Sequence, residues 1–197
     1  MNHRTTAAIA ALAAAGLLTL TSCSLDESSV DTTPKTNASK ADTNADSPKE
    51  APSSPAPKKK AGVGDTLTVT GFQDGEQLDV TLKKWLPTAK SSDPYFGPEQ
   101  GKRWAAAQFE IVNTGSKAYS DSPSNGAQVA DGQGQRFSSW FGEITAGPSM
   151  ASDVNLPKGE KALGWIVFEV PKDSKITSVQ FAMNSGFADE TGQWQMQ

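Results

Sequence analysis

The side chains with the most reactive chemistry lie near the beginning of the chain. Its 197 residues include one cysteine, Cys23, and one histidine, His3. A cysteine thiol is a good nucleophile and can form a thioether with diacylglycerol. The residues before it, Leu20, Thr21 and Ser22, are aliphatic, small and small. Small residues leave the peptide bond before Cys23 accessible to a signal peptidase, so this spacing predicts lipid attachment at Cys23.

The segment that precedes Cys23 has the layout of an export signal. Arg4 gives the first residues a positive charge, and residues 7–20 contain no charged side chain and consist mostly of Ala, Leu and Ile. An apolar core of this length is typical of a secretory signal peptide and is short for a helix that spans roughly 30 Å of hydrocarbon. We therefore predict a signal peptide over residues 1–22. The alternatives are a transmembrane anchor and a free cysteine beside an ordinary cleavage site.

Leu20-Thr21-Ser22-Cys23 resembles the bacterial lipobox. In lipoproteins, cleavage falls before the cysteine, which carries acyl chains such as palmitate. The resemblance implies a mature chain that begins at Cys23 and is held to the extracytoplasmic face of a cell membrane. Several acyl chains make such an attachment stable, since each buried methylene contributes about 0.8 kcal/mol. The Ala-rich signal and tether resemble those of Gram-positive, actinobacterial proteins.

Removal of the signal peptide and acylation of Cys23 leave the rest of the chain without histidine or free cysteine. Ser–His and Cys–His catalysis, zinc sites built on these residues and internal disulfides are therefore excluded. Paired carboxylates can still hydrolyse a glycosidic bond, and the candidates are Asp121, Asp131, Glu143 and Asp153. Asp121 and Asp131 also begin loops with oxygen ligands for calcium, although neither follows the twelve-residue calcium-loop pattern. Solvated turns are the simpler interpretation, so we predict no catalytic residue, metal or cofactor.

Aromatic residues occur in two segments where polar loops are expected. Tyr95 and Phe96 lie within residues 90–101, and Trp140 and Phe141 are adjacent in the sequence. Rings that gather on one side of a domain form an exposed apolar patch of the kind that marks interaction sites. These four residues are the predicted partner-binding site. The alternative is that Trp140 and Phe141 belong to one strand, with one ring in the core.

Composition divides the chain after the signal peptide. Residues 23–62 are rich in Ser, Thr, Pro and Lys, with only Leu25 and Val30 as large apolar residues, which is typical of a disordered tether. Residues 63–197 contain all five Trp and all eight Phe, a length and content that suit one domain. Their 11 Lys and Arg against 16 Asp and Glu give a net charge of −5. A phosphate-binding face needs clustered positive charge, so no nucleic-acid partner is expected.

Alternating apolar residues predict strands throughout residues 63–197. The runs are 67–71, 77–83, 104–112, 128–130, 135–140, 163–170, 177–183 and a last one around Trp194. Asp74-Gly75 between the first two runs is typical of a hairpin turn. Short strands separated by turns indicate an all-β fold, specifically an antiparallel immunoglobulin-like β-sandwich. The alanines of residues 104–112 leave a helix open there, and Lys83-Lys84 suggest that their strand lies at a sheet edge.

Several of these segments resemble the domain-of-unknown-function 4352 family (DUF4352), which has a telokin-like, immunoglobulin-like sandwich. The similarity is carried by three segments: Phe109-Glu110-Ile111-Val112-Asn113-Thr114-Gly115, the Asp131-Gly132 turn with Phe137, and Pro157-Lys158-Gly159-Glu160 leading to Gly164-Trp165-Ile166-Val167-Phe168-Glu169-Val170-Pro171. It covers nearly all of residues 63–183. These motifs are structural, and the family has no assigned activity.

Three functions fit the sequence. The first is a membrane-anchored extracytoplasmic lipoprotein that displays a non-catalytic immunoglobulin-like interaction domain to a protein partner. The second is a binder of a small molecule, glycan or cell-wall fragment, which would use aromatic rings for stacking. The remote third is a carboxylate-based hydrolase. We expect the first.

Overall fold

Alternation of buried and exposed side chains produces strands along most of the part of the chain that the structure describes, residues 60–196 of a computed structural model. The strands are β1 (Thr66–Thr70), β2 (Gln77–Ala89), β3 (Lys102–Asn113), β4 (Tyr119–Asp121), β5 (Ala127–Asp131), β6 (Arg136–Trp140), β7 (Val154–Leu156), β8 (Lys161–Pro171), β9 (Ile176–Ala182) and β10 (Thr191–Gln195). The helix α1 (Pro123–Gly126) and the 3-10 helix η1 (Asn184–Gly186) are single turns. No helix in residues 60–196 is long and apolar enough for a membrane span.

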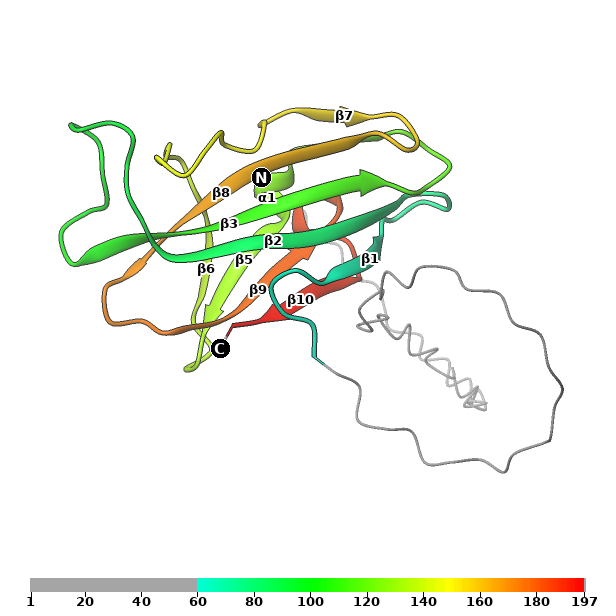
Figure 1. Ribbon diagram of the computed structural model, residues 1–197. Helices are drawn as coiled ribbons and strands as arrows, with labels where there is room; N and C mark the ends of the chain where they lie inside the picture. Colours follow the sequence, from blue (N-terminus) through cyan, green and yellow to red (C-terminus); the bar gives the residue numbers. More distant parts are fainter. Residues whose placement is uncertain (1–59, 197) are drawn as a thin grey trace, which may run out of the picture.

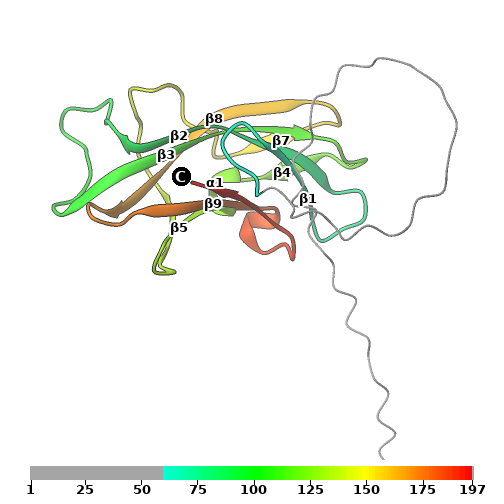
Figure 2. The same ribbon diagram turned by 60° about the horizontal axis from the view of Figure 1, so that its bottom comes forward.

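The strands form a sandwich in which every pairing between strands is antiparallel. The order β1-β2-β3-β8-β6-β5-β9-β10 bends into two layers, with β1, β2, β3 and β8 in the first and β5, β9 and β10 in the second (Figures 1 and 2). β6 joins the layers, because residues 136–138 pair with β5 and residues 139–140 pair with β8. β4 and β7 form a separate two-stranded sheet.

The main core lies between the two layers and is built on aromatic rings. Phe109 of β3 contacts Phe181 of β9 and Trp194 of β10, with both ring centroids 5.7 Å away. The indole N–H of Trp194 donates to the carbonyl of Asp65 at 2.9 Å. The backbone N–H of Gln195 donates to the carbonyl of Ala61 at 2.7 Å, so the chain before β1 lies along the outer edge of β10.

Asn113 and Gly115 explain why the loop after β3 needs its Asn-x-Gly sequence. The Asn113 side chain is buried, and its amide donates to the carbonyls of Lys117 and Leu156 and accepts the N–H of Gly115. A Cβ on Gly115 would lie 2.2 Å from the carbonyl oxygen of Gly75, so only glycine allows this loop to pack on the β1–β2 hairpin. The Asn113-Thr114-Gly115 motif, which resembles that of the DUF4352 family, therefore has a structural role.

The predicted all-β class and antiparallel sandwich are confirmed, and each predicted run coincides with a strand. The helix considered over residues 104–112 is wrong, because this segment is β3 in the middle of the first layer. Lys83 and Lys84 do not lie on an edge strand, since β2 pairs with both β1 and β3. They lie just beyond the last residue that pairs with β1, Thr81, at a bulge in the pairing with β3. Lys83 and Lys84 therefore mark the place where β2 stops pairing with β1, and not a sheet edge.

Candidate binding site

Trp104 and Trp165 form a second, smaller core on the outer face of the first layer. They lie on neighbouring strands, β3 and β8, and are 0% and 3% exposed. They cluster with Ile144 and other apolar side chains, separately from the main core. A ring on the outside of a sheet is buried only where another part of the chain covers it. Two segments do so here, residues 90–101 and 140–147, which we call the aromatic loops.

Both aromatic loops pack against the ring of Trp104. The ring of Phe96 packs on it, with 5.6 Å between the ring centroids. Gly142 lies so close that a Cβ there would be 2.8 Å from the ring edge of Trp104. One buried ring thus holds residues that are far apart in the sequence.

Backbone hydrogen bonds tie the aromatic loops to each other. The N–H of Ser92 donates to the carbonyl of Glu143 at 3.1 Å, and the N–H of Thr145 donates to the carbonyl of Lys90 at 3.0 Å. Ser91 and Ile144 form a β-bridge between them. The bases of the loops therefore run side by side as a short antiparallel pair.

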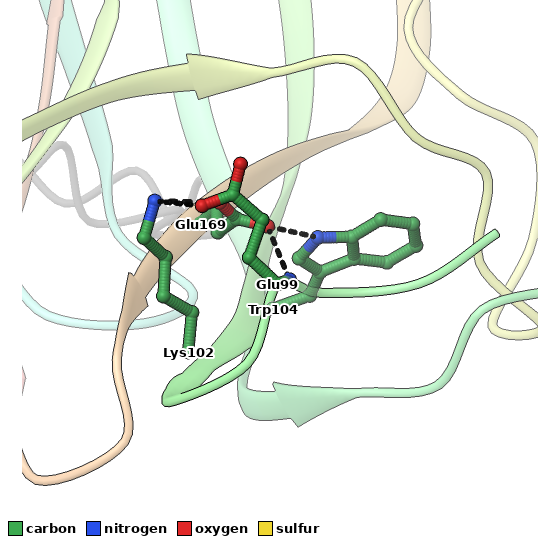
Figure 3. A network of polar contacts seen from close by, with 4 residues as sticks. All are labelled: Glu99, Lys102, Trp104 and Glu169. Atoms are coloured by element: carbon green, nitrogen blue, oxygen red, sulfur yellow. Dashed lines mark hydrogen bonds and ion pairs between the residues drawn. The ribbon is translucent and has the colours of Figure 1, made fainter.

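Glu169 fastens the end of the first aromatic loop to β8 (Figure 3). Its side chain is only 2% exposed, and its Oε1 accepts from Lys102 Nζ at 3.0 Å. Its Oε2 accepts the backbone N–H of Glu99 at 3.1 Å and the indole N–H of Trp104 at 3.3 Å. Lys102 also pairs with the Glu99 carboxylate at 2.7 Å. The carboxylate is satisfied on both oxygens, so its role here is structural.

The pKa of the Glu169 carboxyl reflects two opposing effects. Burial raises it, but the hydrogen bonds from Lys102, from the Glu99 backbone and from Trp104 outweigh burial and hold the pKa below its ordinary value. The pKa of Lys102 is raised, first by Glu99 and then by Glu169. The stabilisation from the Glu169 carboxylate is therefore complete above the unfolded-state pKa of about 4.3 and is lost as the pH falls through the lower folded-state value.

We expect Glu169→Gln to lower the free energy of unfolding by about 1–2 kcal/mol at neutral pH, because an amide replaces the charged acceptor and faces the Lys102 ammonium. Urea unfolding at about pH 7 and about pH 3 measures the pH dependence. The difference between wild type and variant should shrink in acid, because protonation of the wild-type carboxylate removes its charge. Glu160→Gln, at an exposed glutamate, is the control. A difference that stays constant with pH would contradict this account.

A strap of residues 148–150 covers the edge of β8 beyond β6. The N–H of Trp165 donates to the carbonyl of Pro148 at 3.0 Å, and the N–H of Met150 donates to the carbonyl of Trp165 at 2.8 Å. Gly164 makes this approach possible, because a Cβ there would lie 2.4 Å from the Cα of Met150. The glycine of the third resembling segment thus positions the strap.

A groove of about 450 Å³ lies between the end of β6, the strap and the turn of α1. Trp140 and Phe141 line it together with serine side chains, Asn125 and Glu143, and residues 165–167 of β8 contribute to it. Trp140 and Phe141 belong to the second aromatic loop, so this loop forms the aromatic side of the groove.

The predicted partner-binding residues all carry solvent-exposed rings. Tyr95 and Phe141 are 96% and 89% exposed, whereas Phe96, which packs on Trp104, is 43% exposed, and Trp140, which lines the groove, is 41% exposed. The structure therefore places them on two neighbouring loops. The predicted lipid attachment site Cys23, the lipobox residues Leu20, Thr21 and Ser22, the signal peptide, and the tether up to residue 59 lie outside the described residues.

Two of the acidic candidates, Asp121 and Asp131, accept hydrogen bonds in separate turns. Asp121 accepts hydrogen bonds from Ser122 and from the N–H and hydroxyl of Ser185. Asp131 accepts from the N–H groups of the β5–β6 turn and from the Ser174 hydroxyl, and these bonds lower its pKa despite the opposing effect of burial. Both carboxylates thus close turns. No group of three or more potential metal-ligating His, Cys, Asp or Glu side chains occurs within residues 60–196.

Sequence reasoning missed Trp104, Trp165 and Glu169 as determinants of the site. The alternation of strand residues could have shown which face they share, and Glu169 alone on an apolar strand was a signal for a buried acceptor. Nothing in the sequence indicated that the outer face would be covered. The part played by these residues therefore follows only from the tertiary structure.

Residues 63–191 match the sequence profile of the family described as Domain of unknown function (DUF4352). The chain belongs to the DUF4352 family. The motifs explained above, Asn113-Thr114-Gly115 and the segment from Gly164, lie within this DUF4352 domain. No curated protein matches the chain in sequence.

Solved structures that are similar to this DUF4352 domain include a mycobacterial and a Bacillus protein. The secreted protein MPT63 of Mycobacterium tuberculosis is similar with a TM-score of 0.50 and 19% identity, over 69% of this chain and 95% of MPT63. The yjhA protein of Bacillus subtilis is similar with a TM-score of 0.47 and 15% identity, over 70% of this chain and 99% of yjhA. At such low identity, the likeness to MPT63 shows the fold alone.

Proposed function

We propose that the protein is a membrane-anchored extracytoplasmic lipoprotein whose DUF4352 domain is a non-catalytic interaction module. The proposed contact with a protein partner is made by the aromatic loops through Tyr95, Phe96, Trp140 and Phe141. The observation that carries the proposal is the pairing of these loops over Trp104. This pairing fixes the bases of the loops that carry the exposed rings before any partner arrives, and a preorganised surface loses less conformational entropy on binding.

The location of the loops supports a contact at one end of the domain. The first aromatic loop and the β1–β2 hairpin lie at opposite ends of β2: the hairpin comes before the strand and the loop comes after it (Figure 1). β2 has 13 residues, so the two ends are about 40 Å apart. The hairpin end also exposes rings, Phe72 at 60% and Phe187 at 77%. It therefore provides a matched control surface.

The chemistry of the groove supports a non-catalytic role. Hydrolysis by carboxylates requires two of them across one bond. Of the described residues that line the groove, Glu143 is the only acid. Asp121 and Asp131 bind turn donors elsewhere.

Partner capture tests the proposed contact. Full-length protein, immobilised and incubated with solubilised membranes and cell-wall proteins, is compared with the double variant Tyr95→Ser/Phe141→Ser. We expect the double variant to recover a specific partner at least tenfold less well, since buried aromatic anchors typically contribute 2 kcal/mol or more each. The control variant Phe72→Ser/Phe187→Ser should recover it like wild type. Equal recovery by both double variants would remove the basis of the proposal.

Mass spectrometry of the mature N-terminus tests the proposed anchor. We expect an acylated Cys23 as the first residue and a membrane-bound protein. Cys23→Ala should leave the chain uncleaved by the lipoprotein pathway and without acyl chains, because no other thiol is present. An unmodified cysteine in the mature protein would refute lipid anchoring while leaving the proposed partner contact open to its own test.

A further inference from the structure

We infer that the groove beside Trp140 binds an uncharged oligosaccharide, as a ligand distinct from the protein contact proposed above. The inference goes beyond that contact: the groove shares Trp140 and Phe141 with it, but its serines, Asn125 and Glu143 take no part in the contact. It depends on three features of the groove: free polar groups, an accessible indole ring and the absence of cations.

The polar groups of the groove are available to a ligand. Five serines line it, Ser122, Ser124, Ser139, Ser149 and Ser152, together with Asn125 and Glu143. Their side chains make no hydrogen bond to any residue that the structure describes. Such groups converge from three parts of the chain: the α1 turn, β6 with the loop after it, and the strap with the residues just beyond it. A sugar offers hydroxyls that both donate and accept, which matches serine hydroxyls and an asparagine amide.

The indole of Trp140 gives the groove an apolar platform. Its ring is 41% exposed, and it lines the groove next to Phe141. The C–H faces of a sugar ring are apolar, and a flat aromatic side chain buries them with little loss of side-chain entropy. An aromatic platform surrounded by unpaired hydroxyls thus suits a molecule that has an apolar face and a polar edge.

The charge of the groove restricts the ligand further. Glu143 is the only ionisable side chain among the described residues that line it. An anionic polymer would meet a carboxylate and no compensating cation, so its binding is disfavoured. The volume of about 450 Å³ lies within the range of about 300–1,000 Å³ typical of small-ligand sites. The chemistry therefore favours a short neutral glycan over nucleotides, phosphates or acidic polysaccharides.

The groove is also held open before a ligand binds. One wall is the strap, which is hydrogen-bonded to Trp165 on both sides. The opposite wall is the end of β6, where Trp140 pairs with Val167 of β8. Both walls rest on the same strand, so their separation is set by β8.

The experiment titrates full-length protein with three probes: chitohexaose, cellohexaose and the anionic polymer polygalacturonate. Saturation-transfer NMR and tryptophan fluorescence report binding. We expect saturable binding of at least one neutral oligosaccharide and none of polygalacturonate. Trp140→Ala should weaken this binding at least tenfold and Asn125→Ala severalfold, and Phe187→Ala should leave it unchanged. Tyr95→Ser should also leave it unchanged, which separates the glycan site from the protein contact.

Three results would overturn the inference. They are no saturable binding of either neutral oligosaccharide up to about 10 mM, equal affinity in wild type and Trp140→Ala, or equal affinity for polygalacturonate. Thermal unfolding of each variant identifies any loss of binding that comes from misfolding. None of these results bears on partner capture, so failure of the glycan site and failure of the proposed function remain distinguishable.

Discussion

Replacement of Trp104 by alanine should lower the free energy of unfolding by about 3–5 kcal/mol, the usual cost of truncating a fully buried tryptophan. The ring is 0% exposed and is packed by Phe96 from one aromatic loop and by Gly142 from the other. Its loss also removes one donor from the buried carboxylate of Glu169. For a domain of this size, the melting temperature should fall by roughly 10–20 °C.

The control for this prediction is Trp140→Ala at the same end of the domain. Trp140 is 41% exposed, so its truncation should cost about 1 kcal/mol or less. Urea unfolding gives both free energies, and hydrogen exchange of residues 90–92 and 143–145 reports whether the loops separate in Trp104→Ala. Equal stability of the two variants, with the loop amides still protected, would show that Trp104 does not hold the aromatic loops on the sheet.

Replacement of Gly164 by alanine should destabilise the domain by about 2–3 kcal/mol, at the upper end of the usual cost of overpacking. The new Cβ would lie 2.4 Å from the Cα and 2.5 Å from the N of Met150. Both are backbone atoms, and the strap cannot retreat without losing its hydrogen bonds to Trp165. We therefore expect the strap to detach and the groove to lose one wall.

Gly97→Ala is the matched control, because no heavy atom lies within 4 Å of the position that its Cβ would take. It should be neutral or slightly stabilising, since alanine restricts the unfolded chain. Thermal unfolding measures the stability difference, and hydrogen exchange at Met150 measures release of the strap. If Gly164→Ala behaved like Gly97→Ala in both assays, the account of the strap would be wrong.

The sandwich could be predicted from the sequence because each of its longer strands has a recognisable local pattern of alternating residues. The alternation around Phe109 and around Phe168 requires one face of each strand to be buried, and glycine-containing turns separate the runs. The short strands β4 and β7 were not predicted. Each has three residues and pairs only with the other, and so gives too short a pattern to detect.

The outer core could not be predicted in the same way. Trp104 and Trp165 alternate out of the main core, and periodicity alone would leave them facing solvent. Their burial depends on segments that lie far away in the sequence and return over the sheet. The aromatic positions Tyr95, Phe96, Trp140 and Phe141 were visible in the sequence, but the backbone pairing that makes their loops neighbours was not.

The central claim is that the aromatic loops are the end of the domain that meets a protein partner. A photo-crosslinking residue placed at position 95 or 141 of the full-length protein, and irradiated in living cells, tests it most directly. Positions 72 and 187 at the other end of the sandwich are the controls, and their rings are similarly accessible. The account predicts discrete crosslinked products from positions 95 and 141 and none from the controls. Products from positions 72 and 187 alone, or from neither end, would contradict it.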